Sequence, residues 1–152
     1  MEKLKSSLRF SQSIIFIRVM LSCVFISEGI QKFIFSESLG VGRFVKIGIP
    51  LPGIMAPFVG VVEIVGGGLI LLGLFTRLAA IPLIISMTVA ILTTKIPILL
   101  EKGFWATAHE ARTDWSMILG LIFLLIVGSG HWSLDELRSR NIDKNVKKVQ
   151  HS

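Results

Sequence analysis

A carboxylate, Glu63, lies in the middle of the apolar run 55–75, and that run is long enough to cross a lipid bilayer. A transmembrane helix needs about 20 mostly apolar residues. A charged side chain at the centre of a bilayer costs about 2.5–3.5 kcal/mol on insertion scales, so such residues usually face a partner or a water-filled cavity. Glu63 is therefore the first candidate site residue.

The composition assigns the whole chain to a membrane. Of its 152 residues 52% are hydrophobic and only 17% are charged, and the mean hydropathy is +0.74. A soluble protein of this size would expose too much apolar surface. We therefore expect an all-α membrane protein, a four-transmembrane-helix bundle that forms a single domain over residues 1–152. The expected spans are 13–33, 55–75, 78–100 and 112–130, with a structured loop or short interfacial helix before the second.

The basic residues indicate how the bundle is oriented. Four spans put both termini on one side, which holds nine Lys and Arg, whereas the opposite side holds six. The positive-inside rule therefore places both termini in the cytoplasm. Because these basic residues flank apolar spans, they are typical of topology signals and do not indicate nucleic-acid binding. Ser133 and Glu136 have the spacing of an N-capping box and predict a short cytoplasmic C-terminal helix, followed by a basic, flexible tail over 140–152.

Polar residues of the first two spans fall on shared helix faces. At 100° per residue, Arg18 and Lys32 lie on one face of the first span, and Glu28 precedes Lys32 by four residues, the favourable order for an ion pair. In the second span Glu63 lies on the same side as Gly60, Gly66 and Gly67, where another helix can approach closely. By helix rise, Arg18, Glu28 and Glu63 are within side-chain reach of a common cavity.

The loop expected before the fourth span would bring further polar residues to the outer mouth of that cavity. We infer a polar pocket that opens outward, with Glu63 and Arg18 as the candidate catalytic residues. The candidate binding-pocket residues are Glu28, Lys32, His109, Glu110 and Asp114.

Each of these groups also has a structural interpretation. Arg18 and Glu63 can form a buried ion pair that only fixes the helix register. Glu28 and Lys32 can form an interfacial pair in which the lysine reaches toward water. The polar residues of 109–114 can simply solvate a loop, and because their spacing matches no metal-binding motif we expect no metal.

Other chemistries lack the residues they need. The single cysteine, Cys23, permits no intramolecular disulfide and no paired-cysteine redox motif. The three histidines lie at span edges or in the tail, where they cannot ligate a haem inside the bundle. No phosphate-binding glycine loop or nucleophile elbow is present in the sequence.

Several short motifs follow one another along the chain. Arg18 and Glu28-Gly29-x-x-Lys32 lie in the first span, and Glu63 precedes the glycines of the second. They are followed by Gly73-Leu-x-Thr76-Arg77 and by Gly128-x-Gly130-x-Trp132-Ser133-x-Asp135. In this combination the chain resembles the DoxX family of small bacterial four-helix membrane proteins. The resemblance implies a multi-pass protein of the bacterial inner membrane. Founding members of the family resemble subunits of a thiosulfate:quinone oxidoreductase, and other members are associated with membrane redox or thiol-stress complexes.

Three functions therefore remain open. The first is a quinone-linked redox component or subunit of a membrane oxidoreductase complex, in which quinone is the cofactor and a redox partner protein or a homo-oligomer supplies what one chain lacks. The second is a non-catalytic accessory subunit that docks a membrane partner. The third is a small-solute transporter that uses the same polar cavity.

Overall fold

The structure is a computed structural model that describes residues 2–139, with side chains from Ser11 onward. All of its regular elements within these residues are helical: α1 (Glu2–Ile34), α2 (Val41–Lys46), α3 (Pro52–Leu72), α4 (Thr76–Val127) and a short helix over 134–139. The predicted tail over 140–152 lies outside the described residues. Three of the helices, α1, α3 and α4, are long and apolar enough to cross a membrane.

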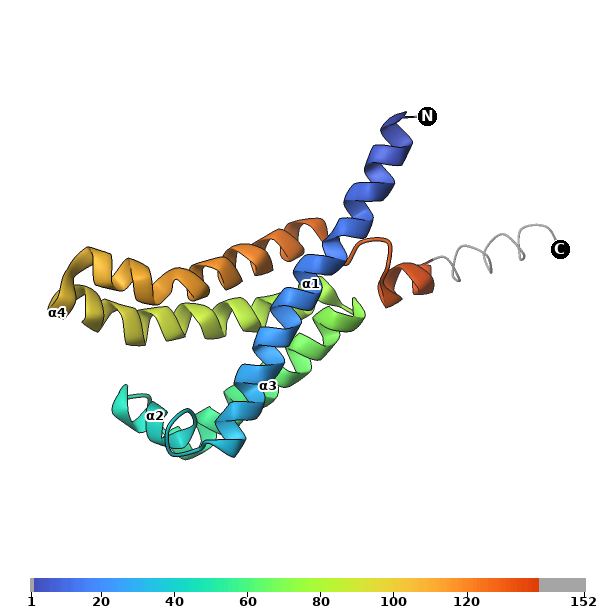
Figure 1. Ribbon diagram of the computed structural model, residues 1–152. Coiled ribbons are helices and arrows are strands. Elements are labelled where there is room, and N and C mark those ends of the chain that lie inside the picture. The colour runs from blue at the N-terminus through green and yellow to red at the C-terminus, as the bar shows by residue number, and fades with distance from the viewer. Residues whose placement is uncertain (1, 140–152) are drawn as a thin grey trace.

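Helices α1 and α3 run side by side and form the most extensive helix pair (Figure 1). In the segment that joins them, α2 packs against α3 and buries Phe44, so this segment contains a short helix, one of the two forms expected for it. The α3 helix begins with Pro52, a residue suited to the first helical position because its missing N–H would have no intrahelical partner there. It ends at Gly73, and the turn to α4 is as short as the sequence predicted.

The long helix α4 is a hairpin of two helical arms. At Gly103 the backbone has φ 78° and ψ −179°, and the chain reverses so that 104–127 returns beside 76–102 (Figure 1). This φ/ψ combination is essentially confined to glycine. The loop expected between the spans 78–100 and 112–130 was wrong beyond Gly103, because residues 104–111 are helical. The Thr107 hydroxyl donates to the Gly103 carbonyl at 3.0 Å, and the alanines that follow favour a helix.

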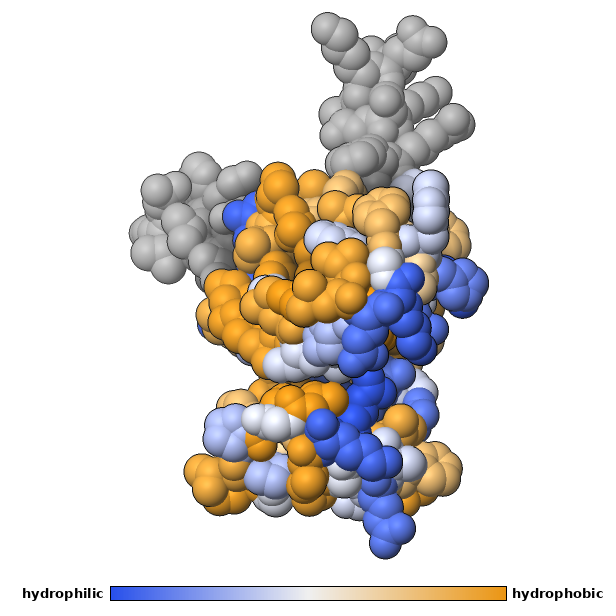
Figure 2. All heavy atoms as spheres, turned by 90° about the vertical axis from the view of Figure 1, so that its left-hand side faces the viewer, coloured by the Kyte–Doolittle hydropathy of each residue, from blue (hydrophilic) through white to orange (hydrophobic). Residues whose placement is uncertain are grey.

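The buried core lies between α1, α3 and the ends of the two α4 arms that are remote from Gly103. It consists of Ile14, Leu21, Phe25, Ile70, Ala79, Ala80, Leu83, Met117, Leu121 and Leu124. Only about a tenth of the most apolar window of α4 is buried inside the chain, against a third for α1 and α3. Figure 2, which views the hairpin end, shows apolar residues over most of that face and a stripe of hydrophilic residues across it. An apolar outer surface of this kind suits lipid.

The predicted N-cap of the C-terminal helix is confirmed. The Ser133 hydroxyl accepts a hydrogen bond from the Glu136 backbone N–H at 3.2 Å and donates to the Gly130 carbonyl at 2.6 Å. Asp135 ties this helix to the start of α4, because its carboxylate accepts from the Phe75 N–H at 3.0 Å while its own N–H donates to the Gly73 carbonyl. The segment after α4 is therefore fixed against the α3–α4 turn.

Candidate functional site

The centre of the candidate site is an ion pair between α1 and α3. The Lys32 ammonium donates to a Glu63 carboxylate oxygen at 2.6 Å. Both side chains are mostly buried, with 11% and 7% of their surfaces exposed. Glu63 is eleven residues inside α3, which is about 16 Å from the start of that helix. The carboxylate that the sequence placed at mid-bilayer depth thus has a cationic partner.

Glu28 extends this pair toward the surface. One of its carboxylate oxygens lies 3.9 Å from the Lys32 ammonium, and its side chain is 53% exposed. The predicted ion pair between Glu28 and Lys32 is therefore confirmed. Lys32 also approaches the Glu28 carbonyl at 3.4 Å. The three side chains form a continuous series of ionisable groups that leads from an exposed carboxylate to a buried one.

Close helix packing brings Lys32 and Glu63 together. A Cβ built on Gly29 would lie 2.7 Å from the Gly60 carbonyl oxygen and 3.1 Å from the Glu63 Cβ, so no larger residue fits between α1 and α3 there. Lys32 is in the last turn of α1, and its side chain reaches back along the helix because Cα–Cβ bonds tilt toward a helix N-terminus. Because of this tilt, the Lys32 side chain can reach the depth of Glu63, and the pair could have been predicted from the sequence on this basis.

Arg18 has a different environment. Its guanidinium donates to the carbonyls of Ile70 at 2.8 Å and Leu71 at 2.6 Å, at the end of α3, and to those of Ser129 at 3.0 Å and Trp132 at 2.6 Å, beyond α4. The residue is 2% exposed. The last carbonyls of a helix have no intrahelical donor, and a buried guanidinium satisfies them. Within the described residues, none of the guanidinium's hydrogen bonds goes to Glu63, so the structure does not bring these two together.

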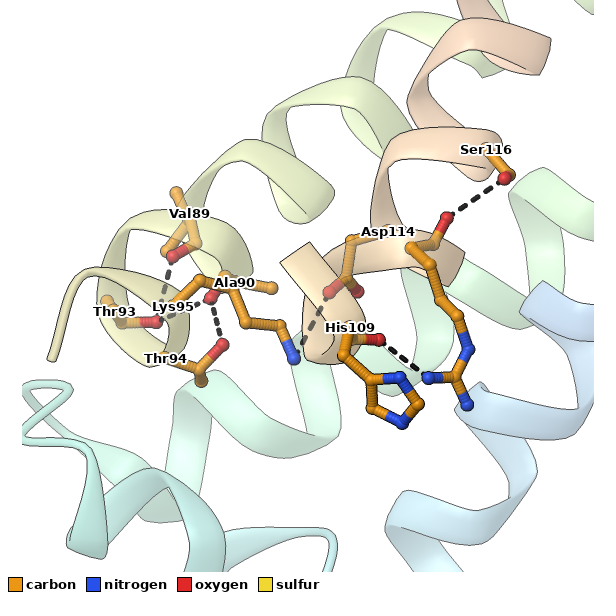
Figure 3. A network of polar contacts seen from close by, with 9 residues as sticks. Val89, Ala90, Thr93, Thr94, Lys95, His109, Asp114 and Ser116 are labelled. Carbon is orange, nitrogen blue, oxygen red and sulfur yellow. Dashed lines mark hydrogen bonds and ion pairs between the residues drawn. The ribbon is translucent and has the colours of Figure 1, made fainter. Parts of the chain in front are cut away.

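The remaining predicted pocket residues lie on the second arm of α4. Asp114 forms an ion pair with Lys95 at 3.2 Å, which joins the two arms (Figure 3). The His109 carbonyl accepts from the Arg112 guanidinium at 2.7 Å within one helical turn. His109 and Glu110 are exposed. In the part of the chain that the structure describes, none of these residues bonds to the Lys32–Glu63 pair.

Lys95 was not among the predicted site residues. Its signal was present, because Lys95 lies inside an apolar span where a cation needs a partner. The partner was hidden because Asp114 was expected at the outer mouth of the cavity, whereas the structure places it on a helical arm that runs beside Lys95 (Figure 3).

Comparison with known proteins identifies the family of this chain. The sequence model of the DoxX family matches residues 13–96, more than half of the chain. The chain is 54% identical over 134 residues to "Uncharacterized membrane protein Rv3486" of Mycobacterium tuberculosis (strain ATCC 25618 / H37Rv), covering 84% of this chain and 82% of that protein. No solved structure matches.

Two further relatives are more distant. "Putative oxidoreductase CatD" of Bacillus subtilis (strain 168) is 30% identical over 126 residues, which are 83% of this chain and 87% of that protein. An "Uncharacterized protein" of Haemophilus influenzae (strain ATCC 51907 / DSM 11121 / KW20 / Rd) is 33% identical over 117 residues, which are 76% and 81% of the two chains. With a family match over half its length and relatives that span most of it, this chain belongs to the DoxX family of membrane proteins.

Proposed function

We propose that the chain is a quinone-linked redox component of a membrane oxidoreductase complex and that Glu63 carries protons within it. The observation that supports this most directly is the series of Glu28, Lys32 and Glu63, which connects an exposed carboxylate with a buried one through contacts of 3.9 and 2.6 Å. Ionisable groups held inside a span are the usual components of proton relays. The B. subtilis relative carries an oxidoreductase name, which supports the same class of function.

The donor set is compatible with a quinone. A quinone carbonyl accepts a hydrogen bond from an ammonium group such as that of Lys32, and its reduction to the quinol consumes two protons and two electrons. In the proposed scheme Glu28 takes up protons at the surface, and Lys32 and Glu63 hold and deliver them inside the bundle. The chain has no cysteine pair for electron transfer, so the two electrons come from a redox partner protein.

Arg18 is assigned a positioning role in this scheme. Its guanidinium is occupied by four backbone carbonyls and is nearly inaccessible. It holds the end of α3 and the segment after α4 in place, and we do not route a proton through it. Asp114 and Lys95 hold the two arms of the α4 hairpin together at the other end.

We further propose that each arm of α4 crosses the inner membrane, which gives four crossings and two cytoplasmic termini. The arms 76–102 and 104–127 are about 40 and 36 Å long by helix rise, and the hydrocarbon core is about 30 Å thick. Acidic and basic residues gather around the reversal at Gly103, as expected for a loop that leaves the bilayer. A single straight helix of 52 residues would be far too long for one crossing.

The function is tested by comparing Glu63→Gln with Glu110→Gln in the complex purified with its native partners in mild detergent. The amide keeps the size of the side chain but carries no transferable proton, so quinone reduction falls at least about 100-fold, the scale of lost acid–base catalysis. Glu110 is exposed on α4, and its variant keeps full activity. Equal expression and equal partner recovery for both variants exclude a folding defect. Undiminished quinone reduction by Glu63→Gln would overturn the proposal.

The glycine face of α3 does not favour the hypothesis that this chain is an accessory subunit that docks a partner through that face. Gly60 and Gly67 are already packed against α1, and Gly66 is packed against Leu83 of α4, so these glycines are not available to another protein. Transport of a small solute is separated from redox function by uptake into proteoliposomes that contain this chain alone. Uptake that Glu63→Gln abolishes, without any quinone reduction by the native complex, would favour the transporter.

A further inference from the structure

A polar cavity lies at the end of the bundle where α4 begins. It has a volume of about 530 Å³, which is within the 300–1,000 Å³ typical of small-molecule sites. Its walls come from segments far apart in the sequence: Ser11 of α1, 75–78 at the start of α4, 127–131 at and after its end, and Asp135 and Glu136 of the following helix. The Glu63 site on α1 and α3 contributes no residue to its lining.

One wall of this cavity is basic. Arg77 belongs to the first turn of α4 and donates to the Ile126 carbonyl at 2.8 Å, which holds its guanidinium at the rim. The first N–H groups of a helix lack intrahelical acceptors and carry a partial positive charge. This wall therefore suits an anionic group such as a phosphate.

Two carboxylates, Asp135 and Glu136, also line the cavity. Asp135 accepts from the Phe75 N–H at 3.0 Å, and Glu136 lies 3.4 Å from the His131 imidazole. Two carboxylates disfavour a ligand that carries only negative charge, and Arg77 disfavours one that carries only positive charge. A ligand that carries both an ammonium and a phosphate complements both the carboxylates and the guanidinium.

Thr76 supplies an independent indication that a ligand belongs here. It lines the cavity, is 1% exposed, and its hydroxyl has no hydrogen-bond partner among the described residues. Leaving a buried hydroxyl unpaired costs about 1–3 kcal/mol. A ligand with an acceptor oxygen would remove that cost.

The rim indicates where the ligand comes from. Phe75 and Leu78 line the same cavity and are 49% and 67% exposed on the surface of an apolar bundle, so the opening is continuous with the region that lipid covers. We propose that this cavity binds the headgroup of a zwitterionic phospholipid with a primary ammonium, such as phosphatidylethanolamine. The phosphate lies against Arg77 and Thr76, the ammonium lies against Asp135 and Glu136, and the lipid chains leave past Phe75 and Leu78.

Native mass spectrometry of the full chain, delipidated in detergent, tests this assignment. The probes are phosphatidylethanolamine, phosphatidylcholine and phosphatidylglycerol with identical acyl chains, and free phosphoethanolamine. We expect phosphatidylethanolamine to bind at least five-fold more tightly than the other two lipids and the free headgroup. Equal binding of the three lipids, or a preference for phosphatidylglycerol, would overturn the zwitterionic assignment. Equal binding of free phosphoethanolamine would overturn the assignment to a lipid.

Variants locate the binding in the cavity. Arg77→Gln is expected to weaken phosphatidylethanolamine binding about ten-fold, and Arg112→Gln, at an exposed arginine of the same helix, is expected to leave it unchanged. Thr76→Val keeps the shape of the side chain and removes only the hydroxyl, so it keeps the test decisive if Arg77→Gln fails to fold. It is expected to weaken binding several-fold. Wild-type binding by Thr76→Val, or an equal loss in Arg112→Gln, would overturn the proposal.

Discussion

The Lys32 ammonium lies 2.6 Å from the Glu63 carboxylate, and the two residues come from α1 and α3, 31 positions apart in the chain. Their backbones approach closely because Gly29 faces Gly60, where a Cβ has no room. Burial makes the two charges dependent on one another, since either one alone would be left in a medium that solvates it poorly. The same contact therefore determines helix packing and holds the ionisable groups of the site.

Removal of Lys32 should destabilise the protein more than removal of Glu28. Lys32→Met leaves the Glu63 carboxylate buried and unpaired, which costs about 3 kcal/mol or more. Glu28→Gln changes a group that is 53% exposed and 3.9 Å from its partner, so its effect should stay below about 1 kcal/mol. Unfolding of the purified protein in mixed detergent micelles, followed by tryptophan fluorescence, measures both changes.

The double variant Lys32→Met with Glu63→Leu serves as the control for this mechanism. It removes both charges, so it should recover most of the stability that Lys32→Met loses. If the double variant were as unstable as the sum of the two single variants, the contact would contribute no coupling energy, contrary to the geometry. The double variant should nevertheless lack quinone reduction, because it has no ionisable group at position 32 or 63 to carry a proton.

Alanine substitution should distinguish packed glycines from free ones. A Cβ at Gly29 would lie 2.7 Å from a backbone oxygen of α3, which cannot move without parting the two helices. We expect Gly29→Ala to destabilise the fold by about 1–3 kcal/mol. Among the described residues, no atom lies within 4 Å of the Cβ position of Gly68, so Gly68→Ala should be neutral or stabilising by up to about 1 kcal/mol through helix propensity. Equal thermal stability of the two variants would contradict the α1–α3 packing.

Replacement of Arg18 should loosen the segment after α4. Arg18→Met leaves the carbonyls of Ile70, Leu71, Ser129 and Trp132 without their donor, and charge-assisted hydrogen bonds are worth about 1.5–3 kcal/mol each. We expect a loss of at least about 3 kcal/mol and faster proteolysis within 128–133. Arg112→Met, at an exposed position, should show neither effect. Unchanged proteolysis of Arg18→Met would show that the guanidinium does not hold this segment.

Local chemistry was sufficient to predict several parts of the fold. The membrane-spanning character of α1 and α3 followed from apolar length, the short turn before α4 from its spacing, and the cap at Ser133 from the capping-box pattern. Each of these signals is contained in a few consecutive residues. The proximity of Glu28 and Lys32 is predictable for the same reason, because a helix places residues four apart beside one another.

The partners of Arg18 were not predictable in this way. They are backbone carbonyls, which every residue carries, and their lack of donors arises only when α3 ends beside the chain that follows α4. Sequence patterns reveal charged side chains and therefore suggested Glu63 as the partner. The pairing of Lys95 with Asp114 was hidden for a related reason, since it depends on where the α4 hairpin reverses.

The reversal at Gly103 should not tolerate a side chain. Its backbone, with φ 78° and ψ −179°, costs other residues about 1–3 kcal/mol, although no atom in the described part of the chain lies within 4 Å of its Cβ position. Gly103→Ala should therefore lower the thermal midpoint through backbone strain alone. Lys102→Ala, one residue earlier in an exposed position, should not lower it. Tolerance of alanine at Gly103 would indicate that the two arms of α4 meet in a different conformation.

Cysteine labelling should place the two ends of the α4 arms on opposite sides of the membrane. In a Cys23→Ser background, Lys102→Cys lies beside the reversal at Gly103 and Ser139→Cys lies at the end of the described C-terminal helix. An impermeant maleimide should label Lys102→Cys in cells whose inner membrane is intact and label Ser139→Cys only after that membrane is opened. The Cys23→Ser background alone reports nonspecific labelling. Labelling of both positions from the same side would contradict two crossings by α4, because a hairpin whose arms both span the bilayer must separate its tip from its ends.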